Sequence, residues 1–81
     1  MGATEMDLLD IIAAEAIVER SALTRDALFA DLGIQSLDVI SVLFEIEDRY
    51  GVIIEEEEMP RASNLGQVLD YLLARINGAP A

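Results

Sequence analysis

The sequence predicts an all-α protein: a small bundle of three main helices plus one short helix, with a long loop between the first and second main helices. Three segments carry apolar residues at the three- and four-residue spacing of a helix face. The run that most resembles a β-strand, residues 52–54, has no partner strand, and an isolated strand is unstable. With 81 residues the chain fits a single domain, 1–81, whose small core allows a narrow cavity but not a large enclosed active site.

The first main helix is expected over residues 4–20. Thr4 and Asp7 stand three residues apart, as in a capping box, where each side chain bonds a backbone N–H group of the first turn. The apolar stripe of this helix consists of Leu8, Leu9, Ile11, Ile12, Ala16 and Ile17.

Residues 21–35 include five large apolar residues, which predicts a connection pinned to the core and not a solvated tether.

The second main helix is predicted over residues 36–50, and Gly51 is suited to end it. This helix is apolar along two stripes, which predicts that it packs against more than one neighbour. One stripe contains Val39, Val42, Leu43, Ile46 and Tyr50, and the other contains Leu37, Ile40, Ser41 and Phe44.

Residues 55–58 are four consecutive glutamates, and they predict a short helical turn that Pro60 ends or constrains. Carboxylates are ligands for divalent cations, but four adjacent residues of a helix cannot all point one way. The spacing of a calcium-binding loop is missing as well. We therefore interpret this run as a solvated acidic turn and predict no metal site.

The last main helix is expected to begin near Ser63 or Asn64 and to continue to Ile76. Asn64 and Gln67 match a variant of the capping box. Gly78 fits the position after the helix end, where a left-handed conformation is common. The expected buried stripe of this last helix consists of Leu65, Val68, Leu69, Leu72, Leu73 and Ile76.

The charge balance narrows the class of partner. Sixteen acidic and five basic residues give a formal net charge of −11, which repels phosphate backbones and anionic membranes and so argues against nucleic-acid binding. Proteins with basic patches should be attracted, and salt should weaken that attraction. The five basic residues are all arginines: Arg20, Arg25, Arg49, Arg61 and Arg75.

The location expected from the sequence is the cytoplasm. Acidic residues stand near the N-terminus, where a secretory signal carries basic residues before a long apolar core. No apolar run approaches the roughly 18 residues of a membrane span, so no membrane insertion is expected. The chain lacks cysteine and histidine, which excludes disulfides, thiolate metal sites and the most common general base.

Ser36 is the most informative single residue. It follows Gly33 by three positions and begins an apolar helix, where free N–H groups and the positive end of the helix dipole stabilise an anion such as a phosphodiester. From position alone, a plain N-cap is the more common role of such a serine. A nucleophile of an enzyme is disfavoured, because Asp38 lies two residues away on the helix and does not face Ser36, and no other base is identifiable.

Residues 33–38, Gly-Ile-Gln-Ser-Leu-Asp, resemble the phosphopantetheine attachment motif of acyl carrier proteins, usually Gly-x-Asp-Ser-Leu. Residues 45–51 and 64–76 resemble the second and last helices of that family. The resemblance implies that a separate phosphopantetheinyl transferase attaches 4′-phosphopantetheine from coenzyme A to Ser36. The thiol of the arm would then hold acyl groups as thioesters and present them to enzymes of fatty-acid, lipid or polyketide biosynthesis. Gln35 departs from the aspartate that is usual before the serine, which suggests a specialised carrier with its own transferase or a carrier that has lost modification. The first is favoured, because Ser36, Leu37 and Asp38 all remain.

The resemblance also implies a monomeric carrier that is not itself an enzyme, with further sites on its surface and between its helices. Partner enzymes with basic docking patches would bind an acidic face, and the acyl chain would lie in an apolar cavity between helices. Taken singly, these residues are equally well explained as solvated surface or ordinary core. The expected partner-binding residues are Leu37, Asp38, Glu45, Glu47 and Asp48. The expected cavity residues are Ile40, Phe44, Ile46, Ile54, Leu65 and Val68.

An alternative function is an unmodified interaction module, an acidic helical bundle that docks on a basic partner protein as a regulator or scaffold. Both functions use the negative surface. The carrier alone requires the hydroxyl group of Ser36, so that group distinguishes the two hypotheses.

Overall fold

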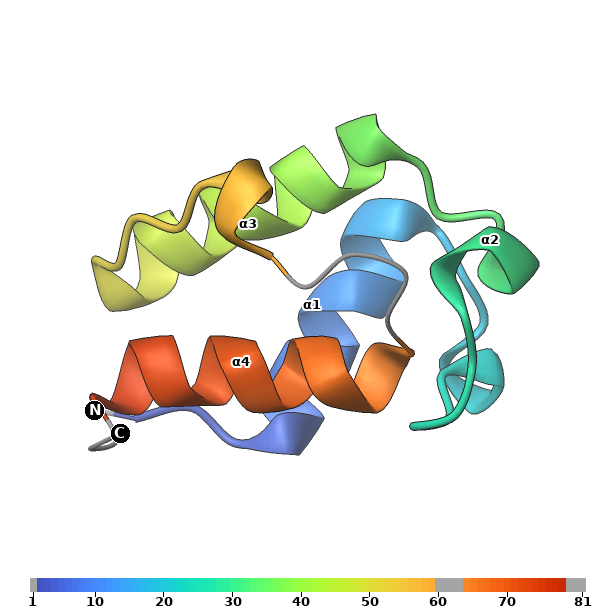
Figure 1. The fold of residues 1–81 in the computed structure, drawn as a ribbon, viewed down its shortest axis with the longest axis horizontal. Coiled ribbons are helices and arrows are strands. Elements are labelled where there is room, and N and C mark those ends of the chain that lie inside the picture. The colour runs from blue at the N-terminus through green and yellow to red at the C-terminus, as the bar shows by residue number, and fades with distance from the viewer. Residues whose placement is uncertain (1, 60–63, 79–81) are drawn as a thin grey trace.

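The computed structural model describes residues 2–59 and 64–78, which form a helical bundle (Figure 1). Within these residues there is no strand, only an isolated antiparallel bridge between Leu28 and Asn64, so the predicted all-α class is confirmed. None of the described helices is long and apolar enough to cross a membrane. The elements in chain order are α1 (Glu5–Ala16), the 3-10 turn η1 (Arg20–Ala22), α2 (Phe29–Leu32), α3 (Ser36–Tyr50), the 3-10 turn η2 (Glu56–Glu58) and α4 (Leu65–Asn77).

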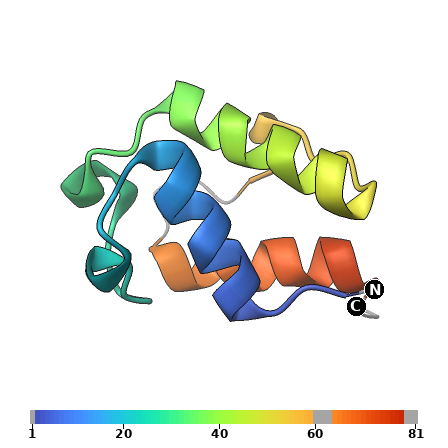
Figure 2. The ribbon, with the colours of Figure 1, turned by 180° about the vertical axis from the view of Figure 1, so that it is seen from behind.

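The three long helices surround one core. In Figure 1, α3 lies above α4, and the view from behind in Figure 2 shows α1 crossing the two on one side. The short helix α2 covers the end of the bundle opposite to the chain termini. Each long helix contributes to the set of side chains with the least exposure, which are Leu8, Ile46, Leu65, Leu69 and Leu72.

The capping pairs predicted at the starts of α1 and α4 are both present. The Thr4 hydroxyl accepts the Asp7 N–H at 3.2 Å, and the Asp7 carboxylate accepts the Thr4 N–H at 3.0 Å. Asn64 and Gln67 form the same reciprocal pair at the start of α4, with distances of 2.9 and 3.3 Å. Gly51 adopts a left-handed conformation, with φ 70°, after the last residue of α3, so the predicted bounds of that helix are confirmed.

The first helix is shorter than predicted, because it ends at Ala16 and not near Arg20. Ile17 adopts a left-handed conformation, with φ 55°, and its side chain is 90% exposed. The Val18 N–H then donates to the Ala13 carbonyl at 3.1 Å, which satisfies a free carbonyl group of the last turn. A β-branched residue rarely adopts this conformation, so sequence patterns place no helix end here.

The connection between α1 and α3 is ordered as predicted, and it contains two short elements that the periodicity did not indicate, η1 and α2. The expected helical turn at residues 55–58 is present as η2. Pro60 and Ser63, which the sequence suggested as the end of that turn and the start of α4, lie outside the described residues.

Candidate functional site

Ser36 is the first residue of α3, and its side chain is exposed to solvent. The N-cap position belongs to Gln35, which has the extended conformation of a cap, with φ −106° and ψ 171°. The N-cap role that position alone favoured for Ser36 is therefore wrong. Within the described residues the Ser36 hydroxyl has no hydrogen-bond partner, so it remains available for chemistry at the surface.

The start of α3 is organised by Asp38. Its carboxylate accepts the N–H of Gln35 at 3.0 Å, which fixes the entry of the chain into the helix. The first intrahelical bond runs from the Val39 N–H to the Gln35 carbonyl at 3.1 Å. The N–H groups of Ser36 and Leu37 precede that bond, so the positive end of the helix dipole lies at the serine.

The turn before α3 orients Ser36 outward. Gly33 ends α2 in a left-handed conformation, with φ 73°, which a residue with a Cβ adopts at a cost. Ile34 then enters the core with 8% of its surface exposed, and its N–H donates to the Phe29 carbonyl at 3.1 Å. With Ile34 anchored inside, the two residues that follow are directed to the surface.

The outer face of α3 combines apolar and acidic side chains. Leu37 and Phe44 are 75% and 65% exposed, and Glu47 and Asp48 are also exposed. Two of the five predicted partner-binding residues are half-buried and already engaged: Asp38 at the helix start and Glu45 in an ion pair with Arg49. The hydrogen bond to Glu45 raises the pKa of Arg49. Leu37, Glu47 and Asp48 are therefore the predicted residues most open to a partner.

An apolar cavity lies between α1, the connection, α3 and α4, with a free volume of about 10 Å³. Such a volume holds about one water molecule, so the bundle is closed in this structure. Of the six predicted cavity residues, Val68 alone lines it. Phe44 is exposed, Ile40 is half-buried, and Ile46, Ile54 and Leu65 are buried in the core without lining it. The lining consists of Ile12, Phe29, Ile34, Val39, Val42, Leu43, Met59, Val68 and Leu72.

The cavity lining differs from the predicted set for a physical reason. Helix α3 has two apolar stripes, and the prediction assigned the cavity to the stripe that includes Ile40 and Phe44. The structure turns the other stripe, with Val39 and Leu43, toward the cavity. The spacing of apolar residues along one helix cannot indicate which of two apolar stripes packs against a given neighbour. Phe29 and Met59 come from short connecting segments, for which helical periodicity provides no signal.

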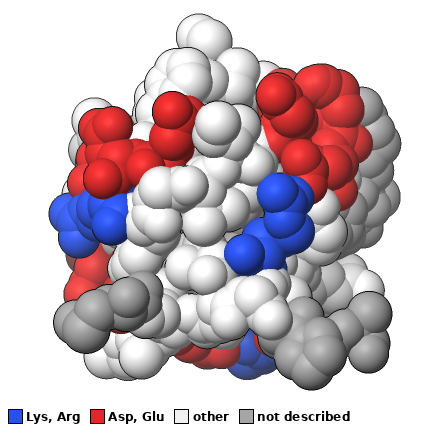
Figure 3. All heavy atoms as spheres, turned by 90° about the vertical axis from the view of Figure 1, so that its left-hand side faces the viewer, with Lys and Arg blue, Asp and Glu red and all other residues white. Residues whose placement is uncertain are grey.

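The surface retains its negative character after internal pairing. Each of the four arginines in the described part of the chain takes part in an ion pair: Arg20 with Asp10, Arg25 with Glu5 and Asp70, Arg49 with Glu45, and Arg75 with Glu58. Figure 3 shows one face of the molecule, where blue groups lie beside red groups and a largely uncharged band separates two acidic areas. No group of three His, Cys, Asp or Glu side chains among residues 2–59 and 64–78 is arranged to hold a metal ion.

Known proteins match this chain over most of its length. The family described as "Phosphopantetheine attachment site" matches residues 7–72, a range that includes the start of α3 and its serine. The acyl carrier protein of Helicobacter pylori strain G27 is 34% identical to the chain over 67 residues. That alignment covers 82% of this chain and 86% of the relative, and the acyl carrier protein of strain HPAG1 matches to the same extent.

Proposed function

Because this chain belongs to the family of acyl carrier proteins, we propose that it carries its 4′-phosphopantetheine arm on Ser36. Its function is that of a carrier: acyl groups are held as thioesters on the arm and are presented to biosynthetic enzymes. The alternative of an unmodified interaction module is not favoured, because it does not account for the match to an attachment-site family.

The observation that carries the assignment is the position of Ser36 at the exposed start of α3 within the matched residues 7–72. Ser41 lies in the same helix but is half-buried, and Ser21 lies in the turn η1. Neither of these residues stands at the start of a long helix. A phosphodiester on Ser36 would lie near the free N–H groups of the first turn, which favour a negative charge.

The residues around Ser36 fit a covalently attached arm. The hydroxyl is open to a transferase, and the Asp38 carboxylate is bound to the Gln35 N–H, which holds the attachment point in one geometry. The arm supplies a thiol, a group that the chain itself lacks. The neutral side chain of Gln35, in place of the aspartate usual in the family, supports recognition by a dedicated transferase.

Partner enzymes are proposed to dock on the outer face of α3. Leu37, beside the attachment point, and Phe44, about two turns further along α3, offer apolar contact area. Glu47 and Asp48 add negative charge at the far end of the helix. A partner with a complementary apolar surface and basic patch matches this arrangement. Charge complementarity acts mainly on the rate of association, so docking should be sensitive to salt.

The acyl chain itself is proposed to use the apolar cavity between α1, the connection, α3 and α4. The cavity has an exclusively apolar lining, which suits a hydrocarbon chain. Its free volume of about 10 Å³ is too small for such a chain without movement of a wall. Loading should therefore change the packing of lining side chains such as Phe29 and Met59.

Carrier domains of this family are not catalytic, and we propose that this chain has no reaction of its own. We propose one carrier domain, residues 1–81, that acts as a monomer in the cytoplasm. The strongly negative surface, with its described arginines already paired, supports protein partners over nucleic acid.

The assignment of Ser36 is tested with fluorescent coenzyme A, a panel of phosphopantetheinyl transferases and two matched variants. Ser36→Ala should abolish labelling, whereas Ser41→Ala, a serine variant in the same helix, should be labelled like the unmodified sequence. Circular dichroism should show that both variants remain helical. Label on the folded Ser36→Ala variant, or its loss from Ser41→Ala alone, would refute the assignment.

A further inference from the structure

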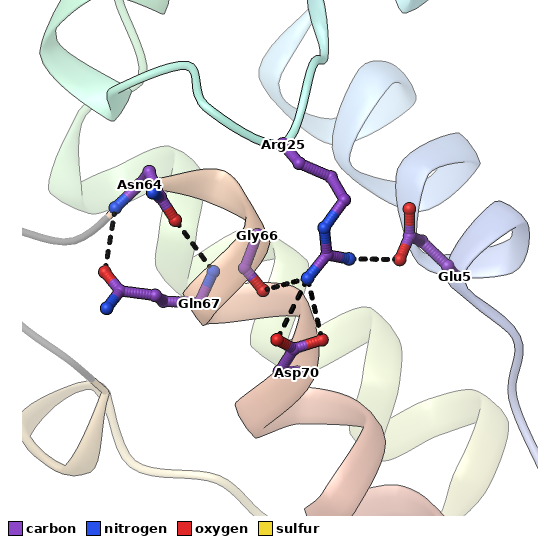
Figure 4. A network of polar contacts seen from close by, with 6 residues as sticks. All are labelled: Glu5, Arg25, Asn64, Gly66, Gln67 and Asp70. Carbon is purple, nitrogen blue, oxygen red and sulfur yellow. Dashed lines mark hydrogen bonds and ion pairs between the residues drawn. The ribbon is translucent and has the colours of Figure 1, made fainter.

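Arg25, in the connection between η1 and α2, joins parts of the chain that are distant in sequence (Figure 4). Its guanidinium donates to both carboxylate oxygens of Asp70 on α4, at 2.9 Å each, and forms an ion pair with Glu5 on α1. It also donates to the Gly66 carbonyl at 3.3 Å. The hydrogen bonds to Asp70 raise the pKa of Arg25, so the guanidinium stays charged. We call Arg25, Glu5, Gly66 and Asp70 the Arg25 clasp.

The backbone of the same segment is bound to the start of α4. The Leu65 N–H donates to the Ala27 carbonyl and the Gly66 N–H donates to the Arg25 carbonyl, both at 2.8 Å. These N–H groups lie in the first turn, where no intrahelical acceptor exists. A Cβ on Gly66 would lie 3.1 Å from the Nε and from the carbonyl oxygen of Arg25. Glycine at this position therefore permits the close approach of the connection to α4.

The segment that follows the clasp forms one wall of the apolar cavity. Phe29 on α2 and Ile34 after it line the cavity together with Val39 and Leu43 of α3 and with Met59. The free volume of about 10 Å³ leaves space for about one water molecule. A hydrocarbon chain can enter only if one of these walls is displaced.

Helix α2 has few restraints of its own. It has four residues, and its N-cap, Leu28, makes no side-chain capping bond. A single helical turn has little stability in isolation. By contrast, α1, α3 and α4 carry side chains that are wholly buried, so displacing one of those helices opens the core. On its N-terminal side, α2 is restrained by the Arg25 clasp, by the backbone bonds of Arg25 and Ala27 to α4 and by the bridge between Leu28 and Asn64. On its C-terminal side it is restrained by the turn at Gly33.

We propose that α2 is a flap over the apolar cavity, hinged at Gly33 and latched by the Arg25 clasp, and that release of the clasp opens the cavity. Arg25 is a positioning residue here, because it acts through the placement of Phe29. The inference rests on the proposed function only for the identity of the occupant, an acyl chain. The flap itself is a property of the unmodified protein and is testable there.

The test uses Ser36→Ala as the background, so that attachment plays no part, and Nile red, a neutral apolar fluorophore, as the probe. Arg25→Met should increase Nile red binding by roughly 1.5-fold to fivefold, the range for exposed ion pairs. Exchange of the Leu65 and Gly66 amide hydrogens should accelerate by a similar factor. High salt should raise both quantities more in the background protein than in Arg25→Met, because only the background protein retains the electrostatic clasp.

Two matched variants separate the flap from general loosening. Arg20→Met removes another exposed ion pair, that of Arg20 with Asp10 on α1, and should leave Nile red binding unchanged. Arg75→Met releases η2, because Arg75 pairs with Glu58 and donates to the Ile53 carbonyl at 3.1 Å. That change loosens the side of the cavity that carries Met59, and it should have a smaller effect than Arg25→Met.

An increase with Arg75→Met but not with Arg25→Met would place the moving wall at Met59 and overturn the flap. Equal increases with Arg20→Met and Arg25→Met would also overturn it, because the cause would be lower stability throughout. If Arg25→Met does not fold, Asp70→Asn removes the bidentate acceptor with little change in shape and takes its place. Because Ser36 is already replaced, none of these results depends on the proposed attachment site.

Discussion

Ile46 and Phe44 lie two residues apart on α3 and should respond to truncation in opposite ways. Ile46 has 0% of its surface exposed and Phe44 has 65% exposed. Before the fold is known, both are candidates for the same acyl cavity. In the structure Ile46 is part of the core and Phe44 is part of the outer face, so Ile46→Ala should lower stability and Phe44→Ala should not.

The magnitudes follow from burial. Truncating a wholly buried isoleucine to alanine costs about 2–5 kcal/mol, because apolar contacts are lost and a cavity remains. A chain of this length has a total stability of about 4–12 kcal/mol, so the change removes a large share of it. Full burial of a phenylalanine contributes about 1.5–3 kcal/mol, and about a third of Phe44 is buried, which gives roughly 0.5–1 kcal/mol. The better helix propensity of alanine offsets part of that loss.

The assay is urea denaturation followed by circular dichroism at 25 °C, with the slope of the free energy against urea compared among the three proteins. Equal slopes show that the same surface is exposed on unfolding, so that midpoints report stability. We expect Ile46→Ala to lower the midpoint strongly and Phe44→Ala to leave it nearly unchanged. A loss for Phe44→Ala as large as that for Ile46→Ala would refute the assignment of the two residues to core and surface.

Three further predictions concern the cap of α4, the acidic end of α3 and the residue before Ser36. Asn64→Ala should destabilise the fold by about 1 kcal/mol in the same urea assay, because the Gln67 N–H loses its acceptor, whereas Asn64→Asp should retain stability. Replacing Glu47 and Asp48 by arginine should slow association with a partner enzyme at low salt and have little effect at high salt, as measured by surface plasmon resonance; an equal effect at both would argue against charge-guided docking. Gln35→Asp should speed modification by a general transferase, and unchanged rates in a coenzyme A consumption assay would show that Gln35 does not govern recognition.

The helices were largely predictable because their signals are local. Capping pairs such as Thr4 with Asp7 involve residues three positions apart, and a glycine such as Gly51 marks a left-handed helix end. The end of α1 was not predictable in this way. Ile17 adopts a left-handed conformation that its own side chain disfavours, so the surrounding structure and not local propensity determines the turn.

The candidate site was predictable only where a short motif specifies it. Ser36 stands at the expected start of α3, since the residues around it carry both the helix start and the family resemblance. The cavity lining depends on how the elements pack, and Phe29, from a connection without helical periodicity, lines the same cavity as Val68. The Arg25 clasp joins residues 45 positions apart, and no pattern in a single sequence indicates that pair.

The claim that acyl groups are carried on Ser36 is tested most directly by the intact mass of the protein after incubation with octanoyl-coenzyme A and phosphopantetheinyl transferases. Ser36→Ala serves as the control, and neutral hydroxylamine is added in a second step to cleave thioesters. We predict one added octanoyl-phosphopantetheine group, loss of the octanoyl group alone with hydroxylamine, and no addition to the control. A folded protein that gains no mass with any transferase, or that gains the same mass in the control, would contradict the claim that acyl groups are carried on Ser36.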